Sequence, residues 1–384
     1  MLIFQFTQSH IQKRNLRLVA TIAFVSIFLF CGAALNAQSP DHSRFVTTAS
    51  GSSTSTDKDD VPELPKDTLP AKISTSKIPV GFKSFPKSPA NNPMTEAKSK
   101  LGRRLFFDPI LSNDGTVSCA SCHKPDHGFA SPDPISIGIE GKKGTRNAPS
   151  VLNRGYGTNF SWDGRDASLE EQVMGPLTSE TELGGDLEKI VANLKKDKTY
   201  VEAFSKVFGG STGNSPKQIT TENIAKAIAC FERTLNSGNS AVDRFRNEEY
   251  EALSKKARQG LWIFESRGGC WKCHNGSSLA DDKFHNTGVG FETKDRDVGR
   301  SKITEKEEHK FQFKTPGLRD IEHTAPYMHD GSVKTLKEVV EFYNKGGAPD
   351  DPNLDKKMKP LKLTDEEVGF LVEFLKALTG EKMK

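Results

Sequence analysis

The chain has 384 residues, of which 54 are basic and 50 are acidic, giving a formal net charge of +4. This length is sufficient for two domains that each bury a core of their own. A charge so close to balance creates no strong electrostatic field for a polyanion, which excludes nucleic acid as an expected partner.

The N-terminus has the pattern of an export signal. Lys13, Arg14 and Arg17 precede an uncharged, apolar run over residues 18–35 that ends in small residues. We therefore expect residues 1–37 to be a signal peptide and the mature protein to be periplasmic. Because the run is 18 residues long, an uncleaved membrane anchor is the alternative. Cleavage would remove three basic residues and no acidic one, which brings the mature chain closer to neutrality.

Residues 38–92 consist mainly of Ser, Thr, Pro, Lys and Asp and contain few large apolar side chains. Such a segment cannot bury enough apolar surface to fold, so we expect a disordered leader or linker. Ordered structure is expected to begin near Pro93.

The remaining chain is predicted to be mostly α. Apolar residues recur at helical spacing in five segments, 95–107, 186–208, 222–235, 255–266 and 363–380. Thr364 followed by Glu367 forms a capping box at the start of the last segment. Cys230 lies in the third segment between apolar neighbours and is interpreted as a small buried thiol. Strand-like alternation is rare and short.

Two long segments between the predicted helices, 124–157 and 275–316, contain many Gly and Pro residues. Loops of this length without their own secondary structure are uncommon in a compact domain and need something to pack against. They therefore indicate a bulky non-protein group in the core.

The sequence Cys-x-x-Cys-His occurs twice, as Cys119, Cys122 and His123 and again as Cys270, Cys273 and His274. A redox dithiol would need a βαβ context, which is missing here. A zinc ribbon spaces its two Cys pairs far more closely and does not require a His after each pair. Disulfides are a further alternative. A c-type haem explains every position, because two thiols attach to its vinyl groups and the next His reaches the iron. We therefore predict haem 1 at the first motif and haem 2 at the second.

Two covalent haems fit either an electron carrier or an enzyme with one reactive haem. Near the first motif the next donor is His127, only four residues beyond His123. It would have to reach the opposite haem face, so it is interpreted as a propionate partner or a surface residue. Haem 1 is therefore expected to be five-coordinate and able to bind a small oxidant.

Over about residues 92–380 the chain resembles the bacterial di-haem cytochrome c peroxidase family, including its MauG-type members. The blocks that carry the resemblance stand in family order: LGRRLFFDPILSNDGTVSCASCH, GTRNAPSVLN, FSWDGRDASLEEQ, AIACFERTL, FKTPGLRDIEHTAPYMHDGS and EFYNKGG. The resemblance implies two cytochrome c-like haem domains with long loops. We expect a peroxidatic haem domain over 93–240 and an electron-transfer haem domain over 241–384.

The resemblance also implies the catalytic residues. Trp162 in FSWDGR would lie between the haems, and Gln172 and Glu182 would line the peroxide pocket. A distal carboxylate such as Glu182 can move the proton between the peroxide oxygens if burial raises its pKa toward the working pH. Without the resemblance, Glu182 would be interpreted as a solvated loop acid, Gln172 as a helix-surface residue and Trp162 as a core residue.

A calcium ion near the domain interface is implied in the same way. Asn147 in RNAP, with the backbone carbonyls of Thr324 and Pro326 in TAPY, would provide its oxygen ligands. Oxygen donors of this kind suit that hard cation. Sequence spacing alone would make Asn147 a turn residue.

Two positions depart from many family members. A blocking His is common in the loop before RNAP, whereas this chain has Ile139 there. This agrees with an open haem 1 that needs no reductive activation. At haem 2 many members place a Met and MauG-type members a Tyr, which here is Tyr343, with Met328 as the competing ligand. His329 is interpreted as a structural or inter-haem bridging residue.

Three functions remain open. The first is an exported peroxidase that reduces hydrogen peroxide with electrons from a small cytochrome c or cupredoxin. The second is a MauG-type enzyme that oxidises residues of a partner protein through a bis-ferryl state, although Gly268 stands where that type has a relay Trp and Trp271 would have to substitute. The third is a non-catalytic di-haem electron carrier. A homodimer is compatible with each.

Overall fold

A computed structural model describes residues 78–209 and 216–382. The predicted signal peptide or anchor over 1–37 and most of the predicted leader lie outside the described residues. Within those residues no helix has both the length and the apolar character needed to cross a bilayer. Ordered structure begins before the expected Pro93. Phe82 is buried and stacks on Tyr156, with ring centroids 4.3 Å apart.

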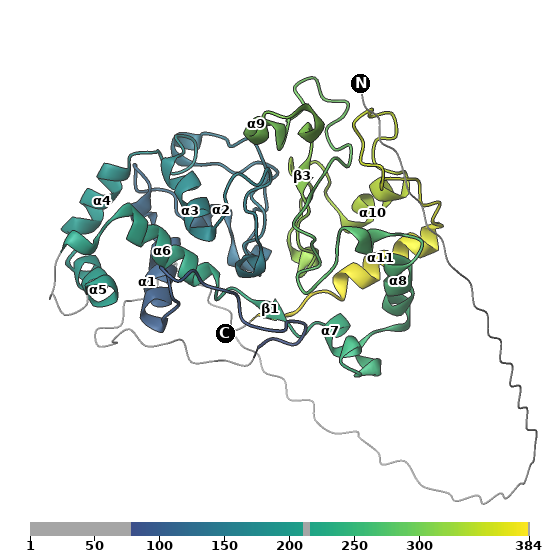
Figure 1. Ribbon diagram of the computed structural model, residues 1–384, viewed down its shortest axis with the longest axis horizontal. Coiled ribbons are helices and arrows are strands. Elements are labelled where there is room, and N and C mark those ends of the chain that lie inside the picture. Colours follow the sequence, from purple (N-terminus) through teal and green to yellow (C-terminus); the bar gives the residue numbers. More distant parts are fainter. Residues whose placement is uncertain (1–77, 210–215, 383–384) are drawn as a thin grey trace, which may run out of the picture. The chain divides into compact units, whose positions relative to one another are not determined.

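The first half of the described chain is built around a helix pair. Helix α1 (Glu96–Phe107) packs against α6 (Thr221–Glu232), as Figure 1 shows. A Cβ at Gly102 would overlap the carbonyl oxygen of Ala227, so the glycine permits the close approach of the two helices. The predicted apolar face of α1 is buried, and so is Cys230 on α6. Around this pair lie α2 (Cys119–Cys122), α3 (Leu169–Thr178), α4 (Leu187–Lys196) and α5 (Lys198–Phe208).

The second half repeats this arrangement. Helix α8 (Lys255–Glu265) packs against α11 (Asp365–Lys376), and Gly260 permits the same close approach to the carbonyl of Phe370. The predicted capping box of Thr364 and Glu367 starts α11. The remaining helices are α7 (Ala241–Arg246), α9 (Ser301–Thr304) and α10 (Leu336–Asn344).

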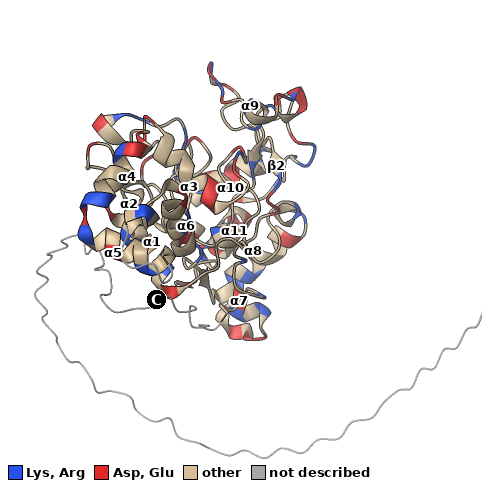
Figure 2. Cartoon of the chain, turned by 60° about the vertical axis from the view of Figure 1, so that its left-hand side comes forward, with Lys and Arg blue, Asp and Glu red and all other residues tan. Residues whose placement is uncertain are grey.

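Strands in the described residues are short. β1 (Ser237–Gly238) pairs antiparallel with β4 (Glu381–Lys382), and β2 (Phe284–His285) pairs antiparallel with β3 (Phe313–Lys314). The prediction of a mostly α fold is confirmed. The two long segments predicted as loops contain only short 3₁₀ turns, isolated bridges, β2, β3 and α9. Basic and acidic residues are interspersed along the helices (Figure 2).

Candidate functional site

The first Cys-x-x-Cys-His motif is held in a defined geometry. Cys119–Cys122 forms α2, and His123 follows at its end. The Nδ1–H of His123 donates to the carbonyl oxygen of Phe129 at 3.2 Å. Phe129 has a φ of 55°, a left-handed conformation that is unusual for a bulky residue and points this carbonyl at the ring. Burial lowers the pKa of His123, so the neutral ring keeps the lone pair of Nε2 free for a metal.

The second motif repeats this geometry. The Nδ1–H of His274 donates to the carbonyl oxygen of Leu279 at 3.0 Å, and Leu279 has a φ of 53°. Burial also lowers the pKa of His274. Both imidazoles are therefore oriented through Nδ1 by a backbone carbonyl, which is the arrangement that prepares a His for iron ligation through Nε2.

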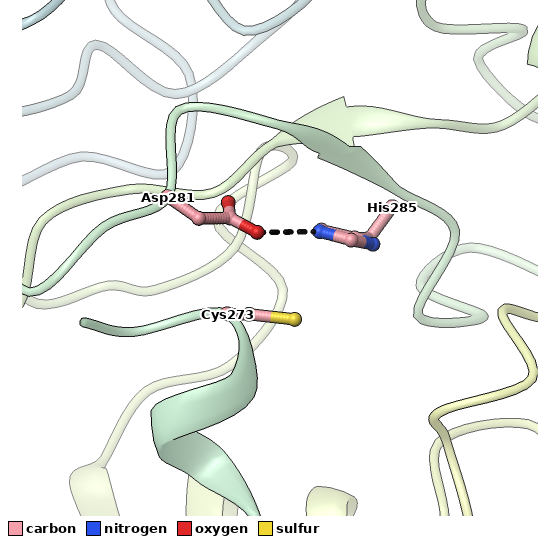
Figure 3. A group of neighbouring side chains, drawn as sticks. All are labelled: Cys273, Asp281 and His285. Carbon is pink, nitrogen blue, oxygen red and sulfur yellow. Dashed lines mark hydrogen bonds and ion pairs between the residues drawn. The ribbon is translucent and has the colours of Figure 1, made fainter.

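The chemistry of the thiols disfavours the alternatives to haem attachment. No described cysteine forms a disulfide. Burial raises the pKa of Cys119 and Cys122 and raises that of Cys270 to about 11, whereas a redox dithiol needs a lowered pKa. The single cluster of metal-binding side chains found among the described residues is Cys273 with Asp281 and His285 (Figure 3), so the two Cys pairs do not form one four-sulfur site.

A cavity of about 1010 Å³ is lined by both motifs. Its volume is at the upper end of the range of ligand sites, and much of its wall is apolar. Thiols and an oriented imidazole from each motif face it. The residues present therefore fit two c-type haems, with Cys119, Cys122 and His123 for one and Cys270, Cys273 and His274 for the other.

The three residues expected to be catalytic all line this cavity. Gln172 lies on α3 and Glu182 in the turn after it. Burial raises the pKa of Glu182, although Arg165 and the Ser179 hydroxyl partly oppose the shift. The Nε1–H of Trp162 donates to the carbonyl oxygen of Asn147 at 2.8 Å. These positions agree with the expected roles, which remain predictions.

Ile139 does not face the cavity. Its side chain is buried in the core of the first half, and Gly138 lines the wall instead. A Cβ at Gly138 would overlap the carbonyl oxygen of Thr181, so this loop packs closely against the turn that carries Glu182. The position therefore offers no ligand to an iron in the cavity.

Both candidates for the second axial ligand of haem 2 line the cavity. Tyr343 lies on α10, and burial raises the pKa of its phenol to about 12. Met328 has a φ of 74°, and the next residue, His329, is buried. The His329 ring stacks on Phe313 at 3.6 Å and contacts Trp162 edge-on at 6.4 Å between centroids. His329 thus connects Trp162 to the second half.

The residues expected to bind calcium also lie where the two halves meet. Asn147, Thr324 and Pro326 line the cavity, and the backbone N–H of Asn147 donates to the carbonyl oxygen of His329 at 2.8 Å. The Nδ2 of Asn147 donates to the carbonyl oxygen of Asp133. The peptide bond before Pro326 is cis. The calcium site remains a prediction.

Several charged residues of the site were not found from the sequence. Arg146 joins the halves through Asp163 and Asp297, each at 2.6 Å. His285 bridges Asp281 and Asp355, beside Cys273 (Figure 3). Because Cys273 is an expected haem attachment residue, we assign this cluster to the haem 2 site and not to a separate metal ion. The half-buried Arg154 and the buried Lys314 and Glu232 also line the cavity. Isolated charged residues outside a motif carry no sequence signal for such positions.

The paired helices and the two attachment motifs together define a c-type cytochrome with two haem sites. A family model described as di-haem cytochrome c peroxidase matches residues 96–251. The chain is 37% identical over 295 residues to the methylamine utilization protein MauG of Methylorubrum extorquens, covering 76% of this chain and 81% of that protein. It is 34% identical over 331 residues to the cytochrome c551 peroxidase of Nitrosomonas europaea, covering 83% of this chain and 93% of that protein.

Among solved structures, a MauG-like protein associated with microbial copper homeostasis is similar with a TM-score of 0.72 at 32% identity. The match covers 78% of this chain and 94% of that one. The chain therefore belongs to the di-haem cytochrome c peroxidase family. This confirms the resemblance seen in the sequence, and membership implies two c-type haems.

Proposed function

We propose that the protein is an exported peroxidase that reduces hydrogen peroxide to water with two electrons from a small cytochrome c or cupredoxin. The observation that carries the proposal is Glu182, a half-buried carboxyl with a raised pKa on the wall of the cavity that also receives His123. Relatives named cytochrome c peroxidase support the activity.

The residues of this chain would divide the reaction as follows. Bound haem would supply the iron that takes up peroxide and the reducing equivalents that cleave it. Glu182 takes a proton from one peroxide oxygen and delivers it to the other, which then leaves as water. Gln172, on the same wall, provides a hydrogen-bonding amide. Two protons and two electrons convert each peroxide to two waters.

Cys270, Cys273 and His274 would hold the haem that supplies the electron-accepting centre, and side chains between the halves would provide the route toward the first half. Trp162, His329 and Phe313 form a continuous line of rings, and the Trp162 indole is fixed by its hydrogen bond to Asn147. We place the peroxidatic half at 93–240 and the electron-accepting half at 241–384, with the calcium ion of Asn147, Thr324 and Pro326 where they meet. Export to the periplasm and a homodimer belong to the same proposal.

The second candidate is a MauG-type enzyme that oxidises residues of a partner protein. Tyr343 favours it, because this buried phenol lines the cavity at the position expected for that type. The identity of 37% to a MauG protein also favours it. Against it, Gly268 lines the cavity where a relay Trp is expected, while Trp271 is 47% exposed.

Stopped-flow mixing of the ferric holoprotein with peroxide, with and without reduced cytochrome c, tests these functions. Turnover of the cytochrome supports the peroxidase. A long-lived oxidised spectrum without turnover supports the MauG-type enzyme. No reaction with peroxide, and two low-spin irons at rest, would show a plain electron carrier and overturn both.

A further inference from the structure

Two cationic side chains from distant parts of the chain face the cavity from inside the protein. Arg154 lies in the first half, and its side chain is 16% exposed. Lys314 lies on β3 in the second half and is 7% exposed. Neither belongs to the attachment motifs or to the expected catalytic residues.

Their one common counterion is too distant to satisfy them. Asp282 Oδ1 lies 3.7 Å from Nη1 of Arg154 and 3.9 Å from Nζ of Lys314, beyond hydrogen-bonding distance for both. Its Oδ2 accepts instead from the backbone N–H of Thr158. The hydrogen bonds of these side chains run to backbone oxygens, from Nη2 of Arg154 to Asn159 and from Nζ of Lys314 to Thr315. Within the described residues neither side chain donates a hydrogen bond to a carboxylate.

Glu232, a further carboxyl on this wall, does not supply the missing anion. Glu232 lines the cavity and is 4% exposed, and its Oε2 has no hydrogen-bond partner within the described chain. Burial raises the pKa of Glu232 to about 8, so it is mainly neutral at pH 7. Burial, with Arg154 nearby, lowers the pKa of Lys314 to about 7. Burial without a hydrogen-bonded anion thus disfavours the charged form of Lys314, and a carboxylate bound at this wall would restore that charge.

We propose that Arg154 and Lys314 bind a haem propionate, so that one haem carboxylate completes the charge balance and is held by both halves of the protein. The guanidinium of Arg154 can donate two parallel hydrogen bonds to a carboxylate, and the Lys314 ammonium can add a third. Neutral Glu232 can donate one more. The inference depends on the two haems of the family and not on the peroxidase proposal.

The first experiment measures haem reduction potentials by spectroelectrochemistry in holoprotein carrying Lys314→Met or Arg154→Met. Removing a cation beside a propionate destabilises the reduced haem, so both variants are expected to lower the potential of the same haem and leave the other unchanged. Resonance Raman spectra are expected to show a shifted propionate-bending band for that haem. Arg154→Lys keeps the charge and is expected to restore most of the potential.

Lys98→Met is the matched control. Lys98 is also buried, but its ammonium donates to Asn92 and to the carbonyl of Pro93 and does not line the cavity. This variant is expected to lose stability without a change in either potential. If Lys314→Met fails to retain haem, the pair Arg154→Met and Arg154→Lys decides the question.

Two results would overturn the proposal. One is potentials and propionate bands that stay unchanged in the Met variants at full haem content. The other is a haem reduction potential of the wild-type protein that changes when acetate is added, together with unshifted propionate bands in the variants. The site would then bind a small soluble carboxylate and not a propionate. A wild-type protein insensitive to acetate supports the propionate assignment.

Discussion

The backbone N–H of Ile139 donates a hydrogen bond to the carbonyl oxygen of Glu182 at 3.0 Å. The loop in which many family members carry a blocking His is thus attached to the turn that carries the proposed acid–base residue. With the Ile139 side chain in the core, the loop supports Glu182 and leaves the cavity wall to Gly138.

This contact predicts that Gly138→Ala impairs the reaction with peroxide. The new Cβ would overlap the carbonyl oxygen of Thr181 and displace the adjacent Glu182. A displacement of about 1 Å can cost about 10²-fold in rate, so we expect a fall of about 10- to 100-fold in stopped-flow experiments. Gly144→Ala is the control, because the nearest atom to its Cβ is 3.8 Å away. Equal rates in the two variants would show that the loop does not position Glu182.

Replacing Glu182 by Gln tests proton transfer directly. The variant keeps the shape of the side chain but removes the base, so the rate with peroxide should fall by about 10²- to 10⁴-fold. Exposed Glu180, two residues earlier, is the control, and Glu180→Gln should react normally. A Glu182→Gln variant as fast as wild type would refute the assignment.

The pH profile provides an independent test. Glu182 acts as a base in its deprotonated form, and burial raises its pKa above the ordinary value of 4.5. The rate of reaction with peroxide should therefore be maximal above the raised pKa and decline as the pH falls through it. This decline should occur at a higher pH than it would for an exposed glutamate. The decline should be absent from the residual rate of Glu182→Gln. If the decline at low pH persists in Glu182→Gln, it is caused by another titratable group.

The second axial ligand of haem 2 can be identified from spectra. Tyr343→Phe should change the haem 2 absorption and electron paramagnetic resonance signals, because a phenolate ligand is lost. Met328→Leu should leave them unchanged. The opposite pattern would make Met328 the ligand, which the cavity lining also permits.

The junction between the halves should depend on Arg146. Its guanidinium bonds Asp163 and Asp297, and the Asp163 side chain is 3% exposed. Arg146→Met leaves Asp163 with the exposed Arg165 alone and removes the salt bridge of Asp297. We expect a loss of about 1–3 kcal/mol in the free energy of unfolding, measured by denaturant titration. Lys142→Met, which breaks an exposed pair with Glu140, should have no measurable effect.

Acid should weaken the same junction. Burial alone would raise the pKa of Asp297, but hydrogen bonds from Arg146 hold it below the ordinary value of 3.8. Its stabilising contribution is therefore complete above 3.8 and is lost as pH falls through the lower folded value. Arg146→Met should remove this part of the acid dependence. If the acid dependence of the free energy of unfolding is the same in Arg146→Met and wild type, other carboxylates are responsible for it.

The calcium site is tested by metal analysis. The purified protein is expected to contain one calcium ion per chain, and Asn147→Ala should lose it, because a side-chain oxygen ligand is removed. Asn159→Ala, in the same part of the chain, should retain the ion. Calcium that persists in Asn147→Ala would place the site elsewhere.

Features that depend on neighbouring residues could be predicted from the amino-acid sequence. The two attachment motifs are contiguous, the capping box of Thr364 and Glu367 spans four residues, and the apolar stripes of α1 and α11 follow the helical repeat. Each depends on local geometry, so spacing along the chain is sufficient to find it.

The tertiary structure decided which side chains from distant segments share one cavity. Ile139 packs into the core, while Arg154 and Lys314, 160 positions apart in the numbering, face the same wall. They lie in long segments without periodicity, whose conformation is set by contacts with distant parts of the chain. Burial, and with it the charge state of Glu182, Glu232 and Lys314, exists only once those contacts form.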